Sequence, residues 1–134
     1  MEEIFTIDIS YAQIAVFSPD LENPFNEWTQ VQVDAGYAWR SDSVSFRTDS
    51  DGPHRVRLLV APEFPRPHDA ASRMLEVTID VSGSCQIEVA SIAESRVFSL
   101  PDGRYRLRFE YLPVSEVGSP LVLLSLKPEI TVQG

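Results

Sequence analysis

Hydrophobic and polar residues alternate along most of the chain, and this two-residue period is typical of β-strands with one buried face. The clearest stretch is RMLEVTIDVSG, where branched apolar residues alternate with Glu, Thr and Asp. The pattern predicts nine strands, over residues 3–9, 12–17, 43–48, 55–61, 73–83, 85–90, 96–100, 104–112 and 121–133. We therefore expect one all-β domain over residues 1–134, either a mainly antiparallel β-sandwich or a partly open barrel.

One segment departs from the strand pattern. In NPFNEWTQVQVDAG (23–36), Trp28, Val31 and Ala35 fall on one helical face, either Asn26 or Pro24 is suited to begin a helix, and Gly36 is suited to end it. We predict one short helix near residues 26–35 that caps the sheets.

The strand expected after Gly36 carries an aromatic face. Alternation places Tyr37 and Trp39 on the same face, and we expect that face to point inward. Core packing and a partner interface both remain open for Trp28 and Trp39, and the pattern favours the core.

Charge is distributed unevenly over this acidic chain. The net charge is −9, residues 1–39 hold seven acidic residues and no basic one, and all 11 basic residues follow. An acidic region repels phosphate backbones and attracts basic partners, although negative charge also serves solubility alone.

The segment RYRLRFEYLP (104–113) has two possible readings. Arginine interleaved with aromatic residues is found in strands that stack nucleic-acid bases. Here, however, the alternation places the arginines on one face and the aromatic rings on the other, as in a strand with one buried face. We expect the arginines to pair with acids such as Glu76 and Asp80, and we predict no direct binding to nucleic acid.

Motifs for catalysis or metal binding are missing from the sequence. His54 and His68 lie next to prolines, where we expect solvated loops, and neither has metal-ligand spacing to Cys85. DSDG at 49–52 begins like a calcium loop, but the twelfth position is Val60 instead of glutamate. We predict no catalytic site, no cofactor and no metal.

The apolar runs are too short for a membrane span, which needs about 20 residues. The N-terminal MEEIF lacks the basic start of a signal peptide, and the single cysteine cannot form an intrachain disulfide. We expect a cytoplasmic protein that does not contact a membrane.

Three stretches resemble the competence protein J (ComJ) family: DISYAQIAVFSPD (8–20), NEWTQVQVDAGYAWRSDSVSFRT (26–48) and SLPDGRYRLRFEYLP (99–113). None is a chemical signature, and the specificity lies in their combination and order. The resemblance implies a bacterial, non-enzymatic inhibitor, because the founding member is similar to a protein that binds and restrains a DNA-entry nuclease during competence. Relatives are similar to immunity proteins for nuclease toxins.

A basic protein partner, such as a nuclease, suits the charge pattern. Carboxylates that mimic phosphates would steer association, and Trp, Tyr or Arg side chains would supply anchors. The predicted partner-binding residues are Asp20, Glu22, Glu27, Trp28, Asp34, Arg40 and Asp42. The alternative is a β-sandwich module that binds a carbohydrate or small ligand on the rings of Trp28, Tyr37 and Trp39.

Overall fold

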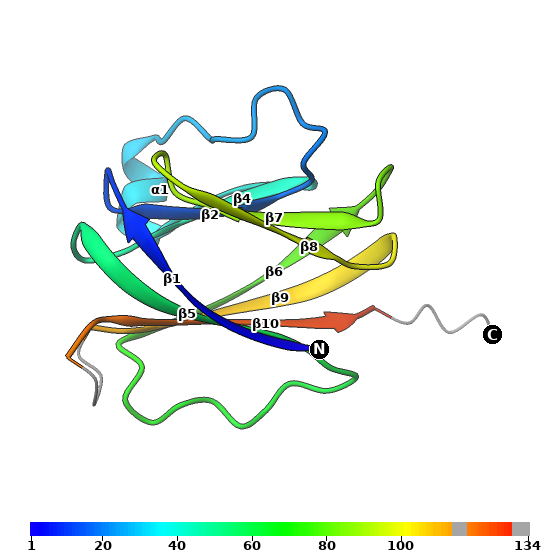
Figure 1. Ribbon diagram of the computed structural model, residues 1–134. Helices are drawn as coiled ribbons and strands as arrows, with labels where there is room; N and C mark the ends of the chain where they lie inside the picture. Colours follow the sequence, from blue (N-terminus) through cyan, green and yellow to red (C-terminus); the bar gives the residue numbers. More distant parts are fainter. Residues whose placement is uncertain (114–117, 130–134) are drawn as a thin grey trace.

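The structure, a computed structural model, describes residues 1–113 and 118–129. Its strands are β1 (Glu2–Ile9), β2 (Gln13–Phe17), β3 (Tyr37–Arg40), β4 (Ser43–Arg47), β5 (Gly52–Val60), β6 (Arg73–Val81), β7 (Gln86–Ala90), β8 (Ser95–Ser99), β9 (Gly103–Leu112) and β10 (Leu121–Pro128), and its helix is α1 (Gln30–Ala35). Sheet A has the order β1-β5-β10-β9-β6 and sheet B the order β3-β4-β2-β7-β8. The two sheets face each other as the layers of a sandwich (Figure 1).

The all-β class with one short helix is confirmed. All strand pairs are antiparallel except β5 with β10, and the two sheets remain separate instead of closing into one barrel. The nine predicted strands are present with their ends shifted by a few residues, and residues 130–133 of the last one lie outside the described part. The tenth strand is β3, which Ser41 and Asp42 separate from β4.

Alternating apolar residues of both sheets form the core. On β9, Tyr105, Leu107, Phe109 and Tyr111 all point inward and are buried, as the alternation predicts. The rings of Phe46 on β4 and Phe109 stack across the two sheets with centroids 4.4 Å apart and planes 3° apart. This contact joins β4 of sheet B to β9 of sheet A.

The prediction that His54 is a solvated loop residue is wrong. β5 begins at Gly52, so His54 lies inside a strand and is fully buried. Its Nδ1 is 2.9 Å from the carbonyl oxygen of Gly52 and its Nε2 is 3.0 Å from the Tyr111 hydroxyl. Pro53 lies at the start of β5, opposite Asp8 of β1, and pairing with β10 begins only at Arg55. A proline without an N–H is tolerated at such a strand start.

The outer face of sheet A carries the predicted ion pairs. Arg104 lies 3.0 Å from Asp80, and Glu76 accepts from Arg106 at 3.2 Å and from Arg108 at 3.1 Å. The arginines of β9 therefore serve cross-strand pairing on an antiparallel sheet, and most of the positive charge on this face is neutralised.

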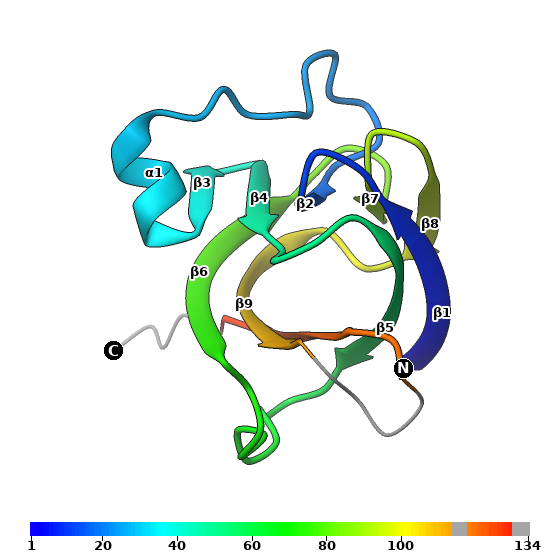
Figure 2. The same ribbon diagram turned by 90° about the vertical axis from the view of Figure 1, so that its left-hand side faces the viewer.

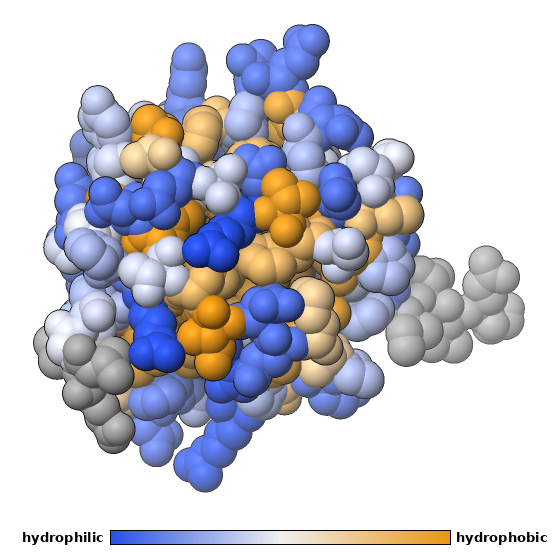
Figure 3. Space-filling model, in the orientation of Figure 1, coloured by the Kyte–Doolittle hydropathy of each residue, from blue (hydrophilic) through white to orange (hydrophobic). Residues whose placement is uncertain are grey.

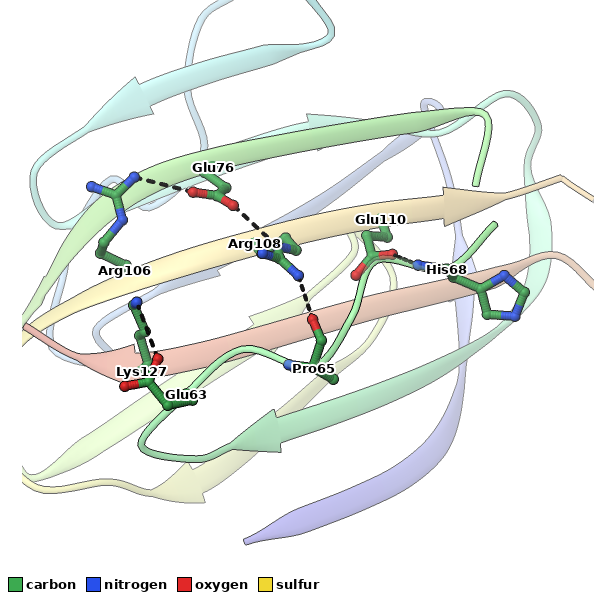
Figure 4. Close-up of polar contacts among 8 residues, drawn as sticks. All are labelled: Glu63, Pro65, His68, Glu76, Arg106, Arg108, Glu110 and Lys127. Carbon is green, nitrogen blue, oxygen red and sulfur yellow. Dashed lines mark hydrogen bonds and ion pairs between the residues drawn. The ribbon is translucent and has the colours of Figure 1, made fainter. Parts of the chain in front are cut away.

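A segment that we call the strap (residues 61–72) crosses this outer face (Figure 4). The sequence pattern does not predict this crossing. Arg108 donates from Nη1 to the carbonyl oxygen of Pro65 at 2.8 Å, and its guanidinium lies 4.4 Å from the ring centroid of Phe64. Glu110 accepts from the backbone N–H of His68 at 2.7 Å. These contacts bury Arg108 and Glu110, although both point away from the core.

Candidate partner-binding surface

A cover segment (residues 18–29) lies over the outer face of sheet B. Its Leu21 and Phe25 pack on Phe17, Ala15 and Ala90. The rings of Phe17 and Phe25 meet edge to face, with centroids 5.8 Å apart. Because β2 is covered on both sides, it reads as a continuous apolar run, and the acids of the cover segment face solvent above it.

Asn26 fastens the cover segment to the sheet. Its Nδ2 donates to the carbonyl oxygen of Ala38 at 3.2 Å and to Ser45 Oγ at 3.3 Å, while its Oδ1 accepts from Arg40 Nε at 2.7 Å. Arg40 also donates to the carbonyl oxygen of Asn23 at 2.5 Å. The guanidinium of Arg40 is thus engaged by neutral oxygens of the cover segment.

Helix α1 begins later than the sequence predicts. Thr29 is the N-cap, and it forms a reciprocal capping box with Gln32. The backbone N–H of Gln32 donates to Thr29 Oγ1 at 3.3 Å, and the backbone N–H of Thr29 donates to Gln32 Oε1 at 2.9 Å. The predicted apolar face is wrong, because Trp28 precedes the helix and Val31 and Ala35 are exposed. The T-x-x-Q motif was the signal for this start. The predicted end is confirmed: Gly36 adopts the left-handed conformation with φ 86°.

The two tryptophans differ in their surroundings. Trp28 is half-buried and donates from Nε1 to Gln13 Oε1 at 3.1 Å. Tyr37 packs against the core, which confirms its inward face. Trp39 lies opposite Val44 on the same face, but it remains 47% exposed because β3 is an edge strand. Burial of Trp39 was therefore the wrong prediction, and of these three rings Trp39 alone is exposed, which disfavours a sugar-binding platform.

Three of the predicted acids lie on the cover segment, but they do not form one cluster. Glu27 and Arg40 line a hollow of about 600 Å³ together with Trp39. Glu22 lines a separate hollow of about 360 Å³ together with Glu88 and Glu94. No local pattern marks these last two acids, and tertiary folding alone brings them near Glu22.

The other predicted residues are spread around this side of the molecule. Asp20 lies beside Gly83 in the turn after β6. Asp34 accepts from Gln30 Nε2 at 2.9 Å within α1, and Asp42 sits in the turn between β3 and β4. The seven predicted residues are therefore not gathered in one pocket, although Glu27 and Arg40 line the same hollow.

The carboxylates of the two sides differ in their pairing. Glu2, Glu63, Glu76 and Asp80 on the sheet A side each form an ion pair. Within residues 1–113 and 118–129, the acids that line the two hollows around the cover segment, which are Glu22, Glu27, Glu88 and Glu94, form none. The cover segment and its neighbouring hollows thus present four carboxylates without ion pairs on the sheet B side.

A second exposed surface is apolar and lies over the edge strands β1 and β8. Ile4 and Val97 are 53% and 47% exposed, and hydrophobic side chains gather in the middle of this face (Figure 3). The guanidinium of Arg96 lies 5.6 Å from the ring centroid of Phe5 beneath it. The basic side chain of Arg96 makes this surface less suited to a basic partner than the cover segment.

Metal-binding groups do not converge in the part of the chain that the structure describes. There, His, Cys, Asp and Glu form no group of three or more that could hold a metal ion. Over the same residues, no helix has the length and hydrophobicity needed to cross a bilayer.

Comparisons with known proteins agree with this architecture. A search of curated proteins gave no significant match. Among solved structures, ComJ of Bacillus subtilis, an inhibitor of the DNA-degrading activity of NucA, is similar with a TM-score of 0.85 and 22% identity, over 95% of this chain and 96% of that one. The protein described as crocagin biosynthetic gene J gives a TM-score of 0.69 and 18% identity, over 97% and 99%.

The similarity to both structures extends over nearly the whole chain and concerns the fold. The family model of competence protein J (ComJ) matches residues 6–127. The chain therefore belongs to the ComJ family.

Proposed function

We propose that this protein is a non-enzymatic inhibitor that binds a nuclease of the NucA type and blocks its DNA-binding surface. One observation carries the proposal: a ComJ-family fold, shared with an inhibitor of DNA degradation, presents unpaired carboxylates around sheet B. The predicted acids Asp20, Glu22 and Glu27 all belong to this side.

The physical basis is competition for positive charge. A nuclease holds DNA through a basic surface, and carboxylates at fixed positions offer that surface an alternative to phosphates. Opposite charges also speed the encounter, and this acceleration weakens as salt screens the field. The cover segment suits the task because packing of Phe25 and the bonds of Asn26 hold its acids in place before binding.

The direct test measures DNA cleavage by a NucA-type nuclease from the same organism, with increasing amounts of the protein. We expect inhibition that saturates at a fixed molar ratio and weakens as the salt concentration rises. A nuclease of unrelated fold serves as the control and should stay active, since general polyanion effects would inhibit both. Full cleavage at low salt with excess protein would refute the proposal for that partner.

A further inference from the structure

We propose that Trp39 is the anchor of this interface and that an arginine or lysine side chain of the partner docks on its indole ring. The inference rests on the proposed function and assigns the contact within it. It is based on one observation: Trp39 is half-exposed on an edge strand and lines two hollows that also contain carboxylates without ion pairs.

β3, which carries Trp39, lies next to β6 (Figure 2). The side chain of Trp39 bridges the two strands. The indole Nε1 of Trp39 donates to the carbonyl oxygen of Thr78 at 2.6 Å. Beside it, the backbone N–H of Asp80 donates to the carbonyl oxygen of Ser41 at 2.7 Å. The indole is therefore fixed before any partner arrives. A fixed ring loses little conformational entropy on binding, which is what makes aromatic anchors effective.

A hollow lies on each side of the ring. The first, of about 440 Å³, runs along β6 and includes Tyr37 and Val77 as apolar lining. The second, of about 600 Å³, lies toward the cover segment and includes Phe25. Trp39 lines both hollows, so its indole forms the wall between them and offers surface to a side chain entering either one.

The charges around Trp39 favour a cation. In the first hollow, Arg104 and Arg106 already pair with Asp80 and Glu76.

The second hollow is closer to neutral, because Arg40 is engaged by neutral oxygens of Asn23 and Asn26 and keeps its positive charge in the same hollow as Glu27. Glu129 in the first hollow forms no ion pair within the described residues, although its charge acts on Arg104, so three carboxylates (Glu76, Asp80 and Glu129) there face two guanidinium groups (Arg104 and Arg106). In the first hollow, an incoming ammonium or guanidinium thus meets an aromatic ring and an excess of negative charge together, and cation–π contacts strengthen when such a site is desolvated.

The first experiment compares binding of the same nuclease to Trp39→Ala, Trp39→Phe and the wild type. We expect the alanine variant to bind at least ~30-fold more weakly, as for a hot-spot residue. The affinity of the phenylalanine variant should lie between those of the wild type and the alanine variant, because it keeps a ring face but loses the indole N–H. Val97→Ala is the matched control, since Val97 is equally exposed on β8 and should bind as the wild type does. An alanine variant within threefold of the wild type would overturn the inference.

A second measurement guards against a folding defect in those variants. The chain has two tryptophans, so fluorotryptophan in a Trp28→Phe protein gives one fluorine NMR signal, from Trp39. Adding the nuclease should shift this signal and reduce its solvent isotope effect. An unchanged signal in a complex that forms would also overturn the inference.

The outcomes separate the two proposals. If the wild type neither binds nor inhibits, the proposed function fails. If the wild type binds while the Trp39 tests are negative, only this inference fails. In that case, a loss of binding in the combined variant Glu22→Gln, Glu88→Gln and Glu94→Gln would place the contact at the other hollow.

Discussion

Glu76 is the residue at which the ion pairs of sheet A converge. Burial tends to raise the pKa of its carboxyl group, but hydrogen bonds and charges from Arg106 and Arg108 outweigh that effect and hold the pKa below its ordinary value. The folded state therefore favours the ionised form of Glu76. One carboxylate in this position satisfies two guanidinium groups of β9.

A pH-dependent loss of stability follows from this lowered pKa. A group whose pKa is lower in the folded state stabilises the fold above its unfolded pKa, here 4.5, and that contribution disappears as the pH falls through the folded value. We expect the free energy of unfolding of the wild type to fall more steeply below pH 4.5 than that of Glu76→Gln. Urea unfolding at several pH values measures this difference, and parallel curves for the two proteins would contradict the assignment.

Trp39 shows the limit of alternation at the level of single residues. The period of two correctly assigned it to the same face as Tyr37, which packs on the core. Exposure, however, depends on whether a neighbouring strand follows, and β3 has none beyond it in sheet B. The same local pattern thus gives a packed tyrosine and a half-exposed tryptophan.

Among the elements, α1 and β3 are joined by Gly36, a position at which any other residue would be strained. Gly36 has φ 86°, and a Cβ atom there would lie 3.1 Å from Nη1 of Arg73. That guanidinium is held by Asp49 at 2.8 Å, so it cannot move away without losing its ion pair. The helix end and the edge of β6 therefore pack closely through this glycine.

Replacement of Gly36 by alanine should lower the free energy of unfolding by about 1–2 kcal/mol from backbone strain alone. The contact with Arg73 adds to that loss. Gly52→Ala is the control, because Gly52 also has a positive φ, 95°, but nothing lies within 4 Å of its added Cβ. We expect the Gly36 variant to be the less stable in urea unfolding. Equal losses would show that the contact with Arg73 contributes nothing.

Across the whole molecule, the two sheets carry different electrostatic surfaces. The outer face of sheet A holds arginines in ion pairs under the strap, whereas the cover segment over sheet B holds acids without cationic partners. The net charge of −9 is therefore directional, and a basic partner is steered toward one side.

Neutralising three acids of the cover segment tests this asymmetry. The combined variant is Asp20→Asn, Glu22→Gln and Glu27→Gln, and its control, on the sheet A side, is Glu3→Gln, Glu63→Gln and Asp69→Asn. Both change the net charge equally. At low salt we expect the first to slow association with the nuclease roughly tenfold and the second to have little effect. Similar rates for both variants would mean that total charge matters and its location does not.

Local sequence patterns were sufficient to predict the strands, the buried face of β9, its ion pairs with Glu76 and Asp80, and the helix end at Gly36. All of these follow from local periodicity and the conformational freedom of glycine. Three features depend on the tertiary structure: the strap buries Arg108, His54 lies in the core although it follows a proline, and Glu88 lines the same hollow as Glu22. These features depend on which distant segments cover a face, and a local pattern carries no information about that.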